Sequence, residues 1–153
     1  MTGDCHVRFR GSPGVRFPRA TRLLSDGRAA IAYAQAHDVV VVASAGNDGS
    51  IAVDEPAALP GVVSVGAVNK EGNRWDGSNT GKGLTLMAPG VDILAADMTR
   101  SQQYSLSTGT SDSTAYVSAT AALVRAKHPD LTAGPRPRRC SVVSGFVVVD
   151  QMP

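Results

Sequence analysis

Two short segments carry residue types that could act together in catalysis. Residues 43–49 read Ala-Ser-Ala-Gly-Asn-Asp-Gly and follow an apolar run, and Gly109-Thr110-Ser111 opens a stretch rich in alanine and valine. A serine at a helix N-terminus is a candidate nucleophile, because free N–H groups and an asparagine amide there favour a developing negative charge. Ser111 is therefore the candidate nucleophile, and Asn47 is the candidate donor to an oxyanion.

Each segment also has a purely structural interpretation. Ser111 can cap the helix that it opens, and Asn47 can occupy a left-handed position in a turn. Other serine-nucleophile patterns do not fit. The segment from Gly109 lacks the second glycine of a nucleophile elbow, and no serine is followed by lysine at the third position.

The strands that would position these residues are predicted from valine runs. Residues 39–43 and 62–68 are apolar without alternation, which is typical of strands buried on both faces of a parallel sheet. We expect these two strands to be parallel neighbours. Shorter extended segments are predicted at 84–87, 91–94 and 104–108.

Two helices complete the predicted framework. One covers Arg28–His37, with Ser25 or Asp26 as its cap. The other covers Ser111–Lys127, and its small apolar body, Ala115–Ala126, predicts burial nearly all round. Strands that alternate with helices in this way favour an α/β fold.

The charge pattern divides the chain into three parts. The 153 residues suit one domain with a net charge of +2, yet the acidic middle lies between basic, Gly- and Pro-rich flanks. We therefore expect an ordered domain over 25–133 and irregular flanks over 1–24 and 134–153. The arginines of the flanks have few aromatic neighbours and no accompanying motif, so nucleic acid is not an expected partner.

Several other classes of protein are disfavoured. The apolar runs are too short for a membrane span, and no apolar leader segment opens the chain, which leaves localisation undecided. The loop after the first valine run lacks the Gly-x-Gly-x-x-Gly pattern of a nucleotide site. Cys5 and Cys140 lie in the flanks, and nothing in the sequence supports a disulfide between them.

Four ordered segments resemble the subtilisin-like serine peptidases, the subtilase family. Asn47 and Ser111 are 64 positions apart, close to the spacing in that family. The resemblance runs from about Asp26 to Thr132. Within it, the residues of the matching segments are similar to those of actinobacterial subtilases, including the mycosin-like ones. The four segments are residues 39–49, 56–68, 87–93 and 109–124.

This resemblance implies a serine endopeptidase that cleaves polypeptides through an acyl-enzyme, without a cofactor. Ser111 would form the acyl bond and Asn47 would stabilise the oxyanion. One wall of the pocket for the side chain before the scissile bond would come from Ser44, Ala45 and Gly46. Asp48 would lie at the rim of that pocket.

The chain departs from the family pattern in three places. Ala115 replaces a proline four residues after the nucleophile, and Asp112 follows Ser111 directly. Most importantly, the Asp-Ser/Thr-Gly and His-Gly-Thr segments, which in the family precede the asparagine segment, are absent. The three histidines are His6, His37 and His128, and none of them lies in a family motif.

The sequence therefore predicts the C-terminal half of a subtilase catalytic domain, inactive alone because a serine without a base is a poor nucleophile. The alternative is a non-enzymatic product, either a degenerate fragment or a small α/β binding module. A frameshifted or misassembled gene is our hypothesis for the flanks. No metal site is predicted: calcium is common in the family, but the loop 56–62 is interpreted as an ordinary turn.

Overall fold

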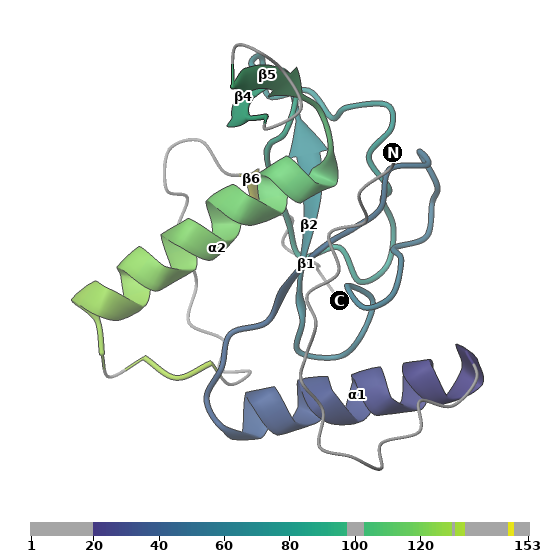
Figure 1. Cartoon of the computed structure of the whole chain (residues 1–153), viewed down its shortest axis with the longest axis vertical. Coiled ribbons are helices and arrows are strands. Elements are labelled where there is room, and N and C mark those ends of the chain that lie inside the picture. The colour runs from purple at the N-terminus through teal and green to yellow at the C-terminus, as the bar shows by residue number, and fades with distance from the viewer. Residues whose placement is uncertain (1–19, 98–102, 130, 134–146, 149–153) are drawn as a thin grey trace.

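The computed structural model describes residues 20–97, 103–129, 131–133 and 147–148. It contains two helices and six short strands within these residues (Figure 1). In chain order they are α1 (Ala20–Ala36), β1 (Val42–Ser44), β2 (Val63–Val68), β3 (Leu86–Pro89), β4 (Ile93–Ala96), β5 (Tyr104–Ser107), α2 (Thr110–Lys127) and β6 (Val147–Val148).

The main sheet has the strand order β1-β2-β3-β6. Val42 lies opposite Val63 and Val65 lies opposite Leu86, both in parallel ladders. The predicted parallel pairing of the two valine runs is confirmed. The first strand is shorter than predicted, because the N–H of Val39 still bonds to the carbonyl of Ala34 at the end of α1.

Helix α2 packs across one face of this sheet, as Figure 1 shows. The core on that side joins Val117 of α2 to Val65 and Ala88. A second core lies among buried residues that include Val68, Met87 and the loop residues around Val53; its members are Ala45, Val53, Ala57, Val68, Leu84 and Met87. Strand side chains alternate between faces, so a short sheet can fill both cores.

The prediction that α2 is buried nearly all round is wrong. Its buried residues are Thr110, Ser113 and Val117, whereas Leu123 is 72% exposed. One helix face meets the sheet, and within the described residues nothing covers the other. Small residues in the body of the helix suggested burial, but alanine is equally a good helix former on an open surface.

Both ends of the ordered region differ from the sequence prediction. Helix α1 begins at Ala20, so Ser25 and Asp26 lie inside it and do not cap it. The segment 20–24 is rich in residues with high helix propensity, so the helix begins before the predicted start. In the segment predicted as an irregular tail, Val147–Val148 forms β6, antiparallel to β3. The predicted limits of the domain are otherwise untested and stay a prediction.

The remaining strands form a separate hairpin. β4 pairs antiparallel with β5, and Leu94 lies opposite Leu106. This hairpin leads directly into the N-terminus of α2 (Figure 1). The extended segments predicted here are confirmed to within about two residues.

Candidate active site

The loop after β1 and the N-terminus of α2 meet at Asn47. The N–H and the hydroxyl of Thr110 both donate to Asn47 Oδ1, at 2.9 Å and 2.8 Å. Because the amide oxygen accepts both bonds, Nδ2 is the group left to donate elsewhere. The structure thus brings Asn47 beside Ser111, the residue that follows Thr110.

The structural interpretation of Asn47 as a left-handed turn residue is wrong. The positive φ angles in this loop belong to Gly46 (111°) and Gly49 (65°). A Cβ on Gly46 would lie 2.2 Å from Asn79 Nδ2 and 2.2 Å from Asp54 Oδ2. Gly46 therefore accommodates both the positive φ of this turn and the close contact with Asn79 and Asp54. The amide of Asn47 remains available for other hydrogen bonds.

Asn79 holds this loop and was missed by the sequence analysis. Its Oδ1 accepts the backbone N–H groups of Asp48 (3.0 Å) and Ser50 (2.9 Å), and its own N–H donates to the carbonyl of Gly46 (3.0 Å). The side chain is fully buried. An asparagine in a Gly-rich loop reads as a turn residue, so the sequence offered no signal for this role.

The start of α2 is fixed above the end of β3. The hydroxyl of Ser113 donates to the carbonyl of Ala88 (2.9 Å), and the N–H of Gly109 donates to the carbonyl of Gly90 (2.8 Å). A Cβ on Gly90 would lie 2.2 Å from Ser113 Oγ, so this contact requires glycine. Residues 88–90, within the segment 87–93 that resembles the family, therefore support the first turn of α2.

Ser111 lies in the first turn of α2 and is exposed. The cap position belongs to Gly109, without a side-chain cap, so the interpretation of Ser111 as a helix cap is wrong. Among the described residues nothing accepts its N–H. An exposed hydroxyl with a free N–H at the positive end of a helix suits attack on a carbonyl and stabilisation of the resulting oxyanion.

Asp112 places a second polar group, its carboxylate, near Gly109. Ser107 Oγ donates to Asp112 Oδ2 at 2.8 Å, which ties the end of β5 to the first turn of α2. A Cβ built on Gly109 would stand 3.6 Å from Asn47 Oδ1 and 3.8 Å from Asp112 Oδ2. The surface over Gly109 is therefore bordered by an amide and by a carboxylate.

Neither described histidine can act as the base for Ser111. His128 follows the C-terminal end of α2, about 25 Å from Ser111 at 1.5 Å of rise per residue. His37 contacts the carbonyl of Tyr33 through Nδ1 (2.8 Å). It adjoins Asp38, whose partner is Arg125 at the same far end of α2. His6 lies outside the described residues.

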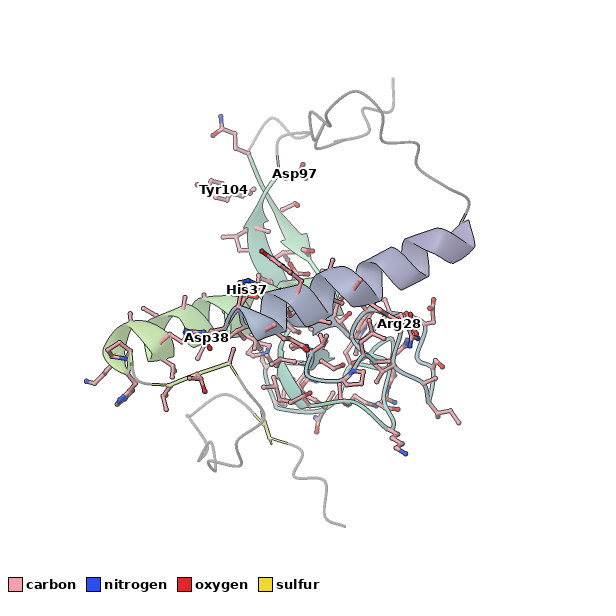
Figure 2. All side chains as sticks on the ribbon, turned by 90° about the horizontal axis from the view of Figure 1, so that it is seen from below. Arg28, His37, Asp38, Asp97 and Tyr104 are labelled. Carbon is pink, nitrogen blue, oxygen red and sulfur yellow. The ribbon has the colours of Figure 1, made fainter. Side chains whose placement is uncertain are left out.

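Figure 2 labels one of these histidines, His37. His37 and Asp38 lie together near α2, while Asp97 and Tyr104 mark the outer end of the β4–β5 hairpin.

The three residues predicted for the pocket wall follow one another at the end of β1. Ser44 is half-buried, and Ala45 is fully buried with its side chain in the core around Val53. The backbone of Ala45 is occupied as well, since its N–H donates to the carbonyl of Val65 (2.9 Å) and its carbonyl accepts from the N–H of Asp54 (3.0 Å). Gly46 has the carboxylate of Asp54 against it, a neighbour that the sequence analysis did not identify.

No set of metal ligands gathers within the described part of the chain. In the loop 56–62, the carbonyls of Pro56, Leu59 and Pro60 accept hydrogen bonds from Leu59, Val62 and Gln35. These bonds fit the interpretation of this loop as an ordinary turn. Neither described helix is long and apolar enough to cross a membrane.

Comparison with known proteins identifies the family. The model of the Subtilase family matches residues 14–135, which is most of the chain. The chain belongs to the subtilase family. The predicted family and the predicted α/β fold are therefore confirmed. The narrower likeness to actinobacterial subtilases stays a prediction.

Individual relatives agree with this assignment. Subtilisin DY from Bacillus licheniformis is 39% identical over 108 residues, which cover 68% of this chain and 39% of that protein. Subtilisin E from Bacillus subtilis (strain 168) is 41% identical over 98 residues, 61% of this chain and 25% of that protein. The self-cleaved protease domain of PatA has a TM-score of 0.62 at 36% identity, covering 67% of this chain and 39% of that one. The chain thus spans well under half the length of these subtilases.

Proposed function

We propose that this chain supplies the nucleophile and the oxyanion site of a serine endopeptidase. The observation that carries the proposal is the pair of hydrogen bonds from Thr110 to Asn47. It holds the asparagine amide against the N-terminus of the helix that bears Ser111. The substrate would be a polypeptide, as the resemblance to subtilases implies.

In the proposed reaction Ser111 Oγ attacks the scissile carbonyl carbon. The carbonyl oxygen gains negative charge and accepts hydrogen bonds from Asn47 Nδ2 and the Ser111 N–H. Thr110 fixes the amide so that Nδ2, and not Oδ1, faces the oxyanion. As the tetrahedral intermediate collapses, the base that holds the Ser111 proton gives it to the departing amine. An acyl group remains on Ser111, and water then removes it as a carboxylic acid.

A base must take the proton from Ser111 during the attack. The two described histidines are at the far end of α2, so this chain does not provide one from its described part. We propose that the base and its aspartate come from an N-terminal portion of a subtilase domain. In the family this portion carries both groups.

A chimera tests the proposal. Residues 26–132 would replace the matched region of Subtilisin E, which would supply the histidine and aspartate. We expect hydrolysis of a chromogenic peptide that disappears with Ser111→Ala. We also expect Asn47→Leu to lower kcat by about 10²–10³ with little change in KM, the magnitude that loss of the oxyanion asparagine has in subtilisin itself.

The control in that experiment is Asn69→Leu, since Asn69 lies in a separate turn and bonds to Glu71 and Asn73. A chimera that folds but gives no Ser111-dependent turnover would contradict the proposal. That outcome would favour the second candidate, a non-enzymatic fragment or binding module. The remoteness of both described histidines from Ser111 is the observation that supports this alternative.

A further inference from the structure

Asp54 lies beside the predicted wall of the pocket for the side chain before the scissile bond. Its N–H donates to the carbonyl of Ala45, the middle residue of that wall (3.0 Å). Its carboxylate lies against the next wall residue, because a Cβ on Gly46 would be 2.2 Å from Asp54 Oδ2. The carbonyl of Asp54 accepts from the N–H of Ala58 (3.0 Å). These contacts hold the carboxylate of Asp54 at the wall.

This carboxylate has no partner of opposite charge within the part of the chain that the structure describes. The ion pair beside it uses the next residue, Glu55, whose partner is Arg28. Asp54 itself is exposed, so a ligand can reach its side chain. Asp48, which the resemblance puts at the rim of the pocket, is exposed as well. The wall therefore carries negative charge that nothing described there neutralises.

A buried amide adds to the polarity of this place. The same Cβ on Gly46 would be 2.2 Å from Asn79 Nδ2, so the amide and the carboxylate lie on one side of the glycine. Asn79 is fully buried, and its Nδ2 has no acceptor among the described residues. An apolar side chain docked here would take the carboxylate and the amide out of water without replacing their hydrogen bonds, which is unfavourable.

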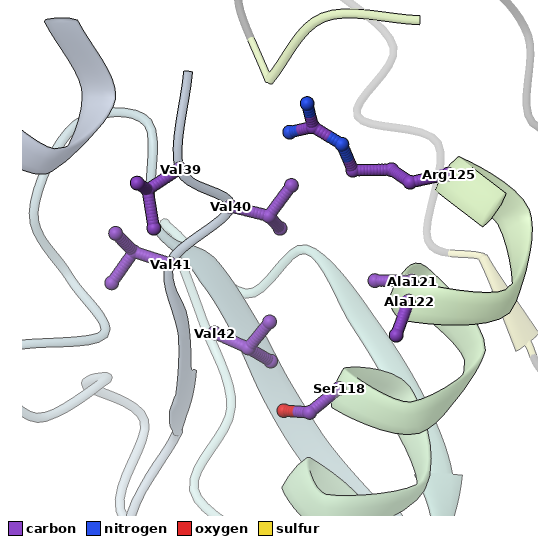
Figure 3. Close-up of a pocket in the computed structure, with 8 residues that line it drawn as sticks. All are labelled: Val39, Val40, Val41, Val42, Ser118, Ala121, Ala122 and Arg125. Atoms are coloured by element: carbon purple, nitrogen blue, oxygen red, sulfur yellow. The ribbon is translucent and has the colours of Figure 1, made fainter. Parts of the chain in front are cut away.

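The groove between β1 and α2 is a different surface with a different preference (Figure 3). Its volume is about 590 Å³, and residues 39–42 line it opposite Ser118, Ala121, Ala122 and Arg125. The one charged residue in this lining is Arg125, which Figure 3 shows on the α2 side. A positive charge there repels a basic side chain, so the negative wall beside Gly46 is the better place for one.

We propose that Asp54 sets the specificity of the site by binding a basic side chain, arginine or lysine, of the residue before the scissile bond. The proposal rests on the proposed function, since that residue is defined by the bond that Ser111 attacks. Because residue 46 is a glycine, no side chain separates the wall from the carboxylate. The cationic end of the substrate side chain donates to the carboxylate, and a charge-assisted hydrogen bond of this kind discriminates against a neutral side chain of the same shape.

The chimera of the proposed function provides the first test. Two peptide p-nitroanilides would differ only in the residue before the scissile bond, which is arginine or its neutral isostere citrulline. We expect kcat/KM to be about tenfold or more higher for arginine. Asp54→Asn should remove this difference by lowering kcat/KM for arginine alone. Equal kcat/KM for both peptides, with turnover that depends on Ser111, would refute the specificity and leave the proposed function intact.

Glu71→Gln is the matched control for Asp54→Asn. It removes the same charge from an exposed residue in the separate turn of Asn69. We expect this variant to keep the preference for arginine, and thermal unfolding verifies that both variants fold. An equal loss of preference in the two variants would reveal a general effect of net charge and overturn the role of Asp54.

A second measurement requires no catalysis. N-acetylarginine amide and N-acetylcitrulline amide would be titrated into the full, isotope-labelled chain and followed by NMR. We expect the arginine probe to shift the amide resonances of Gly46 and Asp54 more than the citrulline probe does, and Asp54→Asn to abolish the difference. If this difference is present while the chimera lacks turnover, the proposed function fails and the basic-residue site stands. Equal shifts by the two probes would refute that site.

Discussion

Arg125 and Asp38 form an ion pair that joins the end of α2 to the turn after α1. Arg125 Nη1 also donates to the carbonyl of Asp38 (2.6 Å), and the N–H of Ala133 donates to Asp38 Oδ1 (2.5 Å). The N–H of Ala133 and, after it, the guanidinium of Arg125 lower the pKa of Asp38 below its ordinary value of 3.8. Two segments that are far apart in sequence are thus held by one carboxylate.

A pH dependence follows for Asp38. Because its pKa is lower in the folded chain, ionised Asp38 stabilises the fold above pH 3.8, and this stabilisation is lost as the pH falls through the folded pKa. We expect Asp38→Asn to lower the melting temperature modestly at pH 7 and to lower it by less at pH 2. Asparagine tolerates the positive φ of 61° at this position. A melting difference that is the same at both pH values would contradict this account.

Gly46 should be the less tolerant of two glycines with positive φ. Gly46→Ala introduces a clash with Asn79 and Asp54, whereas a Cβ on Gly72 (φ 83°) would meet nothing within 4 Å. We expect Gly46→Ala to destabilise the chain by at least about 1 kcal/mol more than Gly72→Ala. Urea unfolding followed by circular dichroism provides the comparison. Equal midpoints would show that Gly46 is not closely packed.

Asn79 and Asn69 form a second matched pair. Each accepts two backbone N–H groups through Oδ1, but Asn79 is fully buried and Asn69 is half-buried. Water can replace the lost acceptor only where it has access, so Asn79→Ala should cost about 1–3 kcal/mol and Asn69→Ala clearly less. In the chimera, Asn79→Ala should also lower kcat, because it releases the loop of Asn47. An unchanged kcat would show that this loop holds its shape without Asn79.

The isolated 153-residue chain should have no peptidase turnover. A serine hydroxyl requires a positioned base during attack, and the described histidines are remote from Ser111. We expect no rapid labelling by a fluorophosphonate, with Ser111→Ala as the control. Fast labelling that depends on Ser111 would prove that a base is present and that our prediction of an incomplete site is wrong.

The sequence predicted the parallel sheet and both helices well, because valine runs and alanine-rich stretches report burial and helix propensity directly. It failed for the exposed side of α2 and for the start of α1. Exposure depends on which elements lie nearby, and the composition of a helix does not contain that information. Strand β6 lies in an apolar run rich in β-branched residues at 146–149, but this run is in the flank that was expected to be irregular, and it does not by itself indicate β3 as the pairing partner.

For the site, the sequence indicated Asn47 and Ser111 as candidates, and their catalytic roles stay a prediction. It did not indicate that Thr110 and Asn79 hold the loop of Asn47. Thr110 lies within the motif, yet its bond to Asn47 joins residues 63 positions apart. Asn79 acts through the backbone of another loop. Such contacts are set by the tertiary fold, and the residue type alone does not reveal them.

From Gly27 onward, the part whose side chains the structure describes, helix α1 contributes no residue to either core. None of its residues from Gly27 onward is buried, and Tyr33 is 67% exposed. The bond from Gln35 Nε2 to the carbonyl of Pro60 (3.0 Å) and the ion pair of Arg28 with Glu55 are polar contacts on the surface.

This attachment has a consequence for folding cooperativity. A helix that adds little buried apolar area can open while the sheet stays intact. The amides of α1 should therefore exchange with solvent through local opening, at a rate insensitive to low urea. Those of β2, at the centre of the sheet, should exchange only through global unfolding, whose free energy falls with urea. The chain would then behave as a stable sheet with its first helix in a separate, faster equilibrium.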